Sequence, residues 1–337
     1  MKKIKFLLLL LLCVTGLCLL ASCGAEEPEC LEFVSNGDGT CYVSGIGTCT
    51  GGKIVIPEKS PEGDAVTGIG SYAFVLNTNI TEVVIPESVT NIDSYAFYRC
   101  SMLQSVEIPP SVKKLGRGVF YGCGALSKAT VPEGVPEIGD DLFYGCNSLQ
   151  YVSIPQSVTS IGESAFYGCS VLTGVTFPDA LQSIGKDAFY GCRALKTLLI
   201  PKSVTWIGGD AFYYCTGLER IHIEDLDAWF LIDFYNVASN PLCYGHELYL
   251  DGAPVVDVTV PESMTEVKKN TFAQCTTLKT ITMHVGVTAV GDEAFYQCTA
   301  LSDVYFMGPR DKMSVKVGSN NEYLKKTTVH YASNAEE

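Results

Sequence analysis

Apolar residues recur along this chain with a fixed period of 23 residues. Phenylalanine keeps one place in nine copies, and cysteine stands three residues after it in eight of them. A copy of this length cannot bury its own apolar face, so the period predicts a solenoid of stacked repeats. The phenylalanines are Phe74, Phe97, Phe120, Phe143, Phe166, Phe189, Phe212, Phe272 and Phe295.

Each copy divides into a strand and a turn. Val106 and Ile108 alternate with polar residues, as in a short half-buried strand, and Pro109 then ends it. The Ala165–Cys169 stretch is too short for a stable isolated helix. We expect it to form one helical turn with its phenylalanine and cysteine inward. The predicted fold class is an α/β solenoid, with a parallel strand sheet on one face and short helical turns on the other.

The N-terminal segment reads as an export signal. Lys2, Lys3 and Lys5 precede an apolar run over residues 6–20, which is too short for a stable membrane span. The tetrapeptide Leu20-Ala21-Ser22-Cys23 resembles the bacterial lipobox. That resemblance implies a lipoprotein signal peptide over 1–22, lipidation at Cys23 and a solvated tether over 23–30. Ordinary cleavage without a lipid is the alternative.

The charge of the chain excludes several classes of partner. The formal net charge is -14, and loss of residues 1–22 removes three lysines and no acid, which gives -17. Nucleic acid demands a basic face, so we expect no nucleic-acid partner. Anionic lipid is excluded as a partner of the protein surface on the same ground. The predicted membrane link is therefore the lipid anchor alone.

The repeat unit Ile161–Cys169, followed by Leu172, Val175 and Phe177-Pro178, resembles the BspA-type leucine-rich repeat of bacterial surface proteins. Three other stretches resemble the opening, long and closing repeats of that family, at residues 45–57, 225–252 and 318–331. The resemblance implies a leucine-rich-repeat domain over 31–332. Within it we expect an enlarged repeat at 222–260 and a C-terminal cap at 307–332, followed by a tail at 333–337.

The same resemblance implies a function. It points to an exported, lipid-anchored interaction protein or adhesin of the cell envelope, binding extracellular-matrix or partner-cell proteins through the repeat array. The alternative is a surface module that captures glycans or peptides for nutrient uptake. We expect a monomer.

Most of the 15 cysteines are predicted to be buried thiols. The repeat cysteines are spaced for stacking and form no C-x-x-C clamp, so a zinc site is not expected. Cys30 and Cys41, near the first repeat, are the better candidates for a disulfide in an exported protein. The segment Asn36–Thr40 predicts a hairpin turn in preference to a calcium loop, because the closing glutamate is missing.

We expect no enzyme activity, cofactor or metal. The four histidines are not spaced as metal ligands, and the sequence contains no G-x-S-x-G or H-E-x-x-H motif. Tyr-Gly-Cys recurs along the array, and this repetition indicates packing, since a catalytic cysteine needs one special environment.

The outward positions of the strands are the candidate binding face. Most are small or polar, and threonine is also simply a good strand former. The exceptions gather near the enlarged repeat, and tyrosine and arginine are common interface anchors. Aromatic residues of the enlarged repeat itself extend this set, either as a protruding binding element or as an apolar patch inside a bulge. The candidate residues are Tyr151, Leu199, Arg220, His222, Trp229 and Tyr249.

Overall fold

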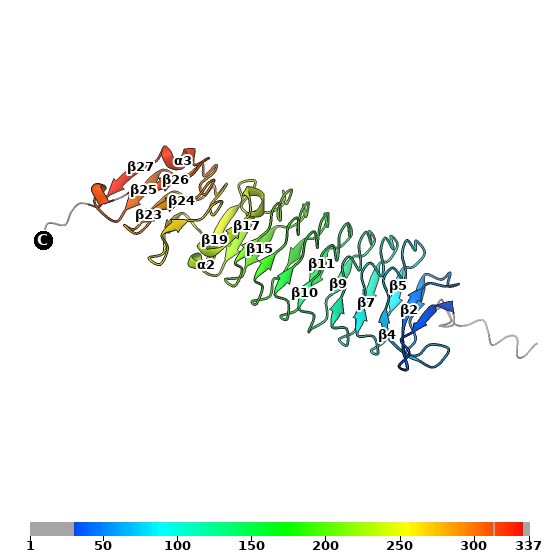
Figure 1. Cartoon of the computed structure of the whole chain (residues 1–337). Coiled ribbons are helices and arrows are strands. Elements are labelled where there is room, and N and C mark those ends of the chain that lie inside the picture. The colour runs from blue at the N-terminus through cyan, green and yellow to red at the C-terminus, as the bar shows by residue number, and fades with distance from the viewer. Residues whose placement is uncertain (1–29, 313, 333–337) are drawn as a thin grey trace, which may run out of the picture.

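Every repeat forms one coil of an elongated stack, with the N-terminal coils at one end and β27 at the other (Figure 1). The computed structural model describes residues 30–312 and 314–332. The signal peptide, Cys23 and the tail at 333–337 lie outside the described residues, as does all of the tether except Cys30. The solenoid of stacked repeats predicted from the 23-residue period is confirmed.

The predicted strand face exists and runs along the stack as parallel sheets. Tyr151 pairs with Lys128, and Val152 with Ala129, each 23 residues apart. Middle residues such as Val152 are buried while their neighbours are exposed or half-buried, as the alternation predicts. The parallel strands are β3 (Lys53–Val55), β5 (Glu82–Val84), β7 (Ser105–Glu107), β9 (Lys128–Thr130), β11 (Tyr151–Ser153), β13 (Gly174–Val175), β15 (Thr197–Ile200), β17 (Arg220–Ile223), β19 (Glu247–Leu250), β21 (Asp257–Thr259), β23 (Thr280–Met283), β25 (Asp303–Phe306) and β27 (Thr328–Tyr331). The short strand β20 (Ala253–Pro254) pairs with β19 in the antiparallel sense.

A second set of parallel sheets, which the sequence analysis did not predict, uses mostly two-residue strands. Ile161 pairs with Ile184 here, and both side chains are buried. The isoleucine before the repeat glycine thus belongs to a ladder of its own. The strands are β2 (Thr40–Gly45), β4 (Ala65–Ile69), β6 (Asn91–Ile92), β8 (Lys114–Leu115), β10 (Glu137–Ile138), β12 (Ser160–Ile161), β14 (Ser183–Ile184), β16 (Trp206–Ile207), β18 (Asp233–Phe234), β22 (Glu266–Val267), β24 (Ala289–Val290) and β26 (Lys316–Val317).

The turn that carries the repeat phenylalanine is not helical in the described residues, so that part of the prediction is wrong. Its N–H groups donate to the next coil: Tyr95 to Arg117, Phe97 to Val119 and Arg99 to Tyr121, at 2.6–2.9 Å. Tyr95 and Arg99 adopt positive φ values near +57°, which no α-helix allows. Bonds between coils thus alternate with bonds inside the turn, such as the one from the Tyr98 N–H to the Tyr95 carbonyl at 2.9 Å, and the continuous bonding of a helix is not formed. Phenylalanine and cysteine do point inward, as predicted.

The interior of the stack is a column of phenylalanine rings. From Phe74 to Phe212, successive ring centroids lie 5.0–5.6 Å apart with nearly parallel planes. Beside the rings, the repeat thiols from Cys100 to Cys215 donate to the phenylalanine carbonyl of the preceding coil, as from Cys169 to Phe143 at 3.2 Å. The described repeat cysteines are free and buried, which confirms their predicted role as thiols.

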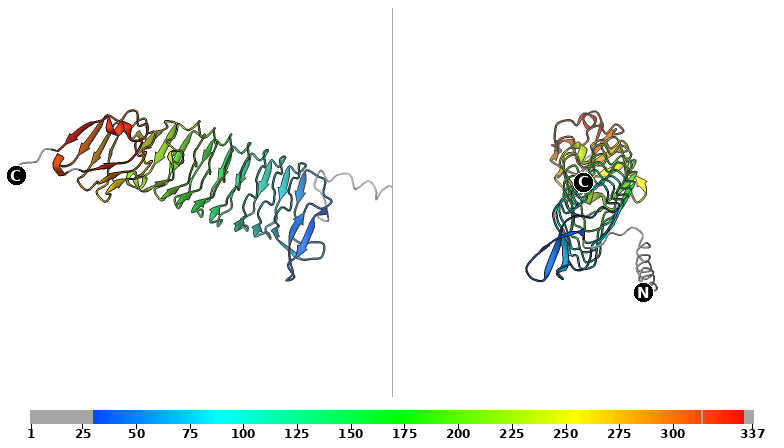
Figure 2. Two further views of the ribbon diagram at one scale, coloured as in Figure 1. Left: turned by 45° about the horizontal axis from the view of Figure 1, so that its top comes forward. Right: turned by 90° about the vertical axis from the view of Figure 1, so that its right-hand side faces the viewer.

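The N-terminal end is sealed by an antiparallel hairpin of β1 (Glu32–Ser35) and β2, which projects beyond the coils (Figure 2). The predicted hairpin turn at residues 36–40 is confirmed. The predicted disulfide between Cys30 and Cys41 is wrong: Cys30 bonds to Cys49. Strand β2 directs Cys41 into the core, where its side chain is 1% exposed and remains a free thiol.

The enlarged repeat adds helix α2 (Leu226–Leu231) and a 3₁₀ turn (Val237–Ser239) before it rejoins the sheet at β19. Asp225 caps α2 by accepting from the Ala228 N–H. The last coil contains a short 3₁₀ turn (Arg310–Lys312) and helix α3 (Glu322–Lys325), and ends with edge strand β27.

Candidate interaction surface

Strand β19 of the enlarged repeat takes the next place beside β17 and so extends the strand face. Tyr249 lies in register with His222, and Glu247 with Arg220. Leu199 on β15 is in register with His222 from the other side. The strand pairing therefore joins Leu199, Arg220, His222 and Tyr249 in one patch, and adds Glu247. These five residues form the strand-face cluster.

Tyr249 holds the cluster together. The Arg220 guanidinium carbon lies 5.5 Å from the Tyr249 ring centroid, and the His222 ring lies 5.4 Å away. The Tyr249 hydroxyl donates to Glu247 Oε2 at 2.8 Å, and this bond is the main cause that raises the pKa of the phenol. Arg220 and Leu199 remain exposed at its edge. The cluster thus offers a cation, a carboxylate and apolar surface in one preorganised group.

Glu247 is not among the residues that the sequence predicts for the binding face, because the pattern that would identify it is weak. The stretch 247–250 alternates polar and apolar residues, but it stands 27 residues after Arg220 instead of 23. The longer spacing hides its membership in the sheet.

Tyr151, also predicted for this face, is exposed but lies apart from the cluster. It sits on β11, separated from β17 by β13 and β15. At about 4.8 Å per strand, that separation is about 14 Å. A partner would have to span several coils to touch both.

Trp229, the remaining predicted residue, is not on the surface, and its assignment to the binding face is wrong. It is 1% exposed, and its Nε1 donates to the Thr271 carbonyl at 3.0 Å. Phe230, beside it, is fully buried and packs edge-on against Phe272. Helix α2 turns this apolar pair inward, so they replace a core ring where the repeat is interrupted.

Beside the cluster lies a hollow of about 440 Å³ between the ends of β17 and β19, lined in part by Glu219, Arg220, Tyr244 and Glu247. Its floor includes His246, which is buried and whose Nδ1 lies 2.7 Å from the Pro241 carbonyl. Burial lowers the pKa of His246. The cluster therefore borders a concave surface, and Arg220 and Glu247 belong to both.

Tyrosines follow the repeat phenylalanines and form a row on the turn edge of the stack. From Tyr121 to Tyr190 the ring centroids are 4.3–4.6 Å apart and the planes are nearly parallel. Because each ring covers the face of the next, the row presents mainly ring edges and hydroxyls. A sugar stacks on an open aromatic face, and this row offers none between its ends.

Chemistry-bearing groups remain dispersed in the described part of the chain. Among residues 30–312 and 314–332, no group of three or more histidine, cysteine or acidic side chains could hold a metal. Burial raises the pKa of the Cys169 thiol to about 12, the opposite of what a thiolate nucleophile needs.

The chain belongs to the BspA type leucine-rich repeat family: the family model matches in six copies over residues 67–160, 136–228 and 248–334. The sequence has no match among curated proteins.

The solved structures that are similar to this chain include three bacterial proteins. A leucine-rich cell surface protein from Faecalibacterium prausnitzii is 25% identical, with 86% of this chain and 97% of that chain covered and a TM-score of 0.43. A leucine-rich repeat protein from Bacteroides ovatus is 22% identical, covering 90% and 98%, with a TM-score of 0.44. The pneumococcal vaccine antigen PcpA is 17% identical, covering 90% and 86%, with a TM-score of 0.43.

Within the residues that the structure describes, no helix is long and apolar enough to cross a membrane.

Proposed function

We propose that this chain is a protein-binding module of the bacterial cell surface, and that the strand-face cluster is its main contact site. The supporting observation is the register of β15, β17 and β19, which brings a leucine, an arginine, a histidine and a tyrosine together on a face whose other residues are mostly small or polar. Clustered tyrosine and arginine side chains are typical of the few residues that dominate an interface. Membership in a surface-protein family agrees with this role.

The test is a binding screen of the mature domain against purified extracellular-matrix proteins and purified glycans, followed by substitution. For a protein that binds, the pair Arg220→Ala and Tyr249→Ala should weaken affinity at least 30-fold, roughly the 2 kcal/mol of a hot spot. The matched control is Arg193→Ala with Tyr235→Ala, two exposed residues outside the cluster. Equal losses in both pairs, or none in the first, would place the contact elsewhere.

Tyr151 extends this test along the array. A partner that lies along several coils should lose affinity on Tyr151→Ala, whereas a partner confined to the cluster should not.

We propose also that the protein is held to the envelope by acylation of Cys23. The support is the lipobox-like Leu20–Cys23 after an apolar run. Cys23→Ala should abolish incorporation of labelled fatty acid and release the protein from the membrane fraction. Incorporation that persists in the variant would refute the anchor.

Sugar capture has less support than protein binding. Trp229 and Phe230 are buried, and the exposed Tyr235 ring is already covered by Lys269, whose Nζ lies 5.4 Å from the ring centroid. If the screen finds a glycan that binds, and the cluster variants bind it as tightly as the wild type, sugar capture would become the better supported function.

A further inference from the structure

The interior of the last coil is left partly unfilled. Val317 on β26 pairs with Val290, and Val329 on β27 pairs with Val304, so the coil closes like its predecessor. Among described residues, however, the last coil contributes one buried apolar side chain between these strands, Leu324. The preceding coil contributes four in the same interval: Ala294, Phe295, Cys298 and Leu301. The column of phenylalanine rings therefore stops one coil before the end.

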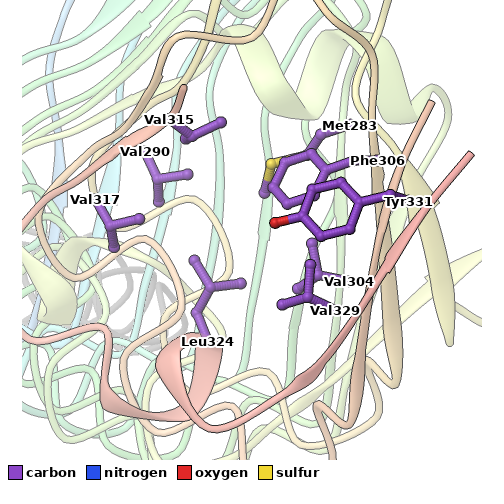
Figure 3. Close-up of a pocket in the computed structure, with 9 residues that line it drawn as sticks. All are labelled: Met283, Val290, Val304, Phe306, Val315, Val317, Leu324, Val329 and Tyr331. Atoms are coloured by element: carbon purple, nitrogen blue, oxygen red, sulfur yellow. The ribbon is translucent and has the colours of Figure 1, made fainter. Parts of the chain in front are cut away.

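The missing ring leaves a cavity of about 290 Å³ between the two sheets (Figure 3). Val290 and Val317 face Val304 and Val329 across it, and Leu324 closes one side. Every lining residue is apolar except Tyr331, whose hydroxyl points between the two walls. An engineered apolar cavity of about 150 Å³ already binds benzene, so this one has room for a longer hydrocarbon.

A basic side chain lies against one of the residues that line the cavity. Arg310 is exposed, and its guanidinium carbon is 5.9 Å from the Tyr331 ring centroid. It forms none of the ion pairs found among the described residues. The cap at 307–332 contains five basic and two acidic residues, a net charge of +3 in a chain of net charge -14. A ligand with an anionic head is therefore favoured at this end of the stack.

We propose that this cavity is a binding site for a single-chain fatty acid. The alkyl chain lies between the valine walls, and the carboxylate meets the Arg310 guanidinium, with the Tyr331 hydroxyl as a hydrogen-bond donor. This site is independent of the strand-face cluster, which lies several coils away. Either proposal can therefore fail without the other.

The first experiment is a calorimetric titration of the mature chain with saturated carboxylates of six to fourteen carbons, below their micellar concentrations. Affinity should rise about fourfold with each methylene while the chain enters the cavity, and should level off once the cavity is full. Decanol should bind at least fivefold more weakly than decanoate. No saturable binding of any carboxylate would overturn the proposal.

Two variants locate the site. Val317→Phe, which returns an aromatic ring to the cavity, should abolish decanoate binding and keep or raise the melting temperature. The matched control Val84→Phe, on the outer strand face, should leave binding unchanged. If the first variant fails to fold, Val329→Phe fills the same space from the half-exposed opposite wall. Binding that survives a folded cavity-filling variant would overturn the proposal.

The head group is tested at Arg310. Arg310→Gln should weaken decanoate binding five- to tenfold and leave decanol binding unchanged. Arg99→Gln is the control, because Arg99 also lies over a tyrosine, 5.3 Å from the Tyr98 ring, but far from the cap. Equal affinities of wild type and Arg310→Gln for decanoate would overturn the assignment of the carboxylate. A wild-type dimer that decanoate does not dissociate would show that a second copy covers the cavity instead.

Discussion

The regular coils over residues 89–212 and the enlarged repeat over 222–260 bury their interiors by different means. In the regular coils every phenylalanine ring meets a copy of itself, and every thiol meets the same carbonyl. The enlarged repeat uses contacts that occur once. Asn240, which is fully buried, donates to the Asn270 and Thr271 carbonyls and accepts from the Leu242 N–H.

The difference bears on function. Translation makes the rungs of a regular stack nearly equivalent, so a partner has little to distinguish one from the next. Recognition of one partner needs a place where the repetition breaks. The strand-face cluster lies at such a place, because β19 reaches the sheet only through the irregular segment before it.

The largest expected effect tests the regular interior. Phe166→Ala should lower the free energy of unfolding by about 3–5 kcal/mol, because a fully buried ring leaves a cavity between two other rings. Urea unfolding followed by circular dichroism measures it. The control is Tyr167→Ala, which removes a half-buried ring from the outside of the same turn and should cost about 1 kcal/mol. Equal costs would mean that the ring column does not hold the coils together.

The regular coils are also the part of the fold that the sequence predicts best. The spacing of 23 residues sets the register, and the alternation around Val106 sets which side chains are buried. The turn was mispredicted because its alanine, phenylalanine and cysteine fit a helix locally. Every second N–H group of the turn bonds to the next coil, and no local sequence pattern indicates such bonds.

The irregular parts could be predicted only in outline. The aromatic content of residues 229–249 indicates an apolar patch, but the capped helix α2 decides that Trp229 points inward. The cysteine spacing allows several disulfides near the first repeat, and the path of the chain around β2 decides in favour of Cys49. The sequence pattern of a regular coil can be recognised because it recurs in many copies, whereas the pattern of the enlarged repeat occurs once.

An intermediate effect is expected in the enlarged repeat. Asn240→Ala should cost about 2–3 kcal/mol, because it leaves the Leu242 N–H buried without a partner and removes one of the two donors to the Asn270 carbonyl. The control Asn147→Ala, on an exposed turn of a regular coil, should cost less than about 0.5 kcal/mol.

The two tryptophans supply the readout for that comparison. Trp206 is 42% exposed and Trp229 is buried, so a Trp206→Phe background leaves Trp229 as the reporter of the enlarged repeat. Asn240→Ala should shift the Trp229 emission transition to lower urea. If Asn240→Ala and Asn147→Ala gave the same urea midpoint, the hydrogen bonds of Asn240 would not stabilise the enlarged repeat.

The smallest effect is the dependence of stability on pH that comes from the histidines, all four of which lie after residue 212. Burial lowers the pKa of His246 below its ordinary value of 6.5, so the unfolded chain binds a proton there more readily than the folded one. The stability that His246 contributes is therefore full above pH 6.5 and declines as the pH falls through 6.5 toward the folded pKa.

Urea midpoints of the Trp206→Phe protein at pH 8 and at pH 5 measure this decline, with Trp229 emission as the probe. Lowered pKa values at Asp38, Asp292 and Asp303 place their own losses of stability in more acidic solution, below pH 4. His246→Gln should remove most of the difference between pH 8 and pH 5, whereas His222→Gln, at the half-exposed cluster histidine, should keep it. A difference that persists in His246→Gln would assign the acid sensitivity to another group. In that case His246 would not be the cause of any loss of stability of the enlarged repeat between pH 8 and pH 5.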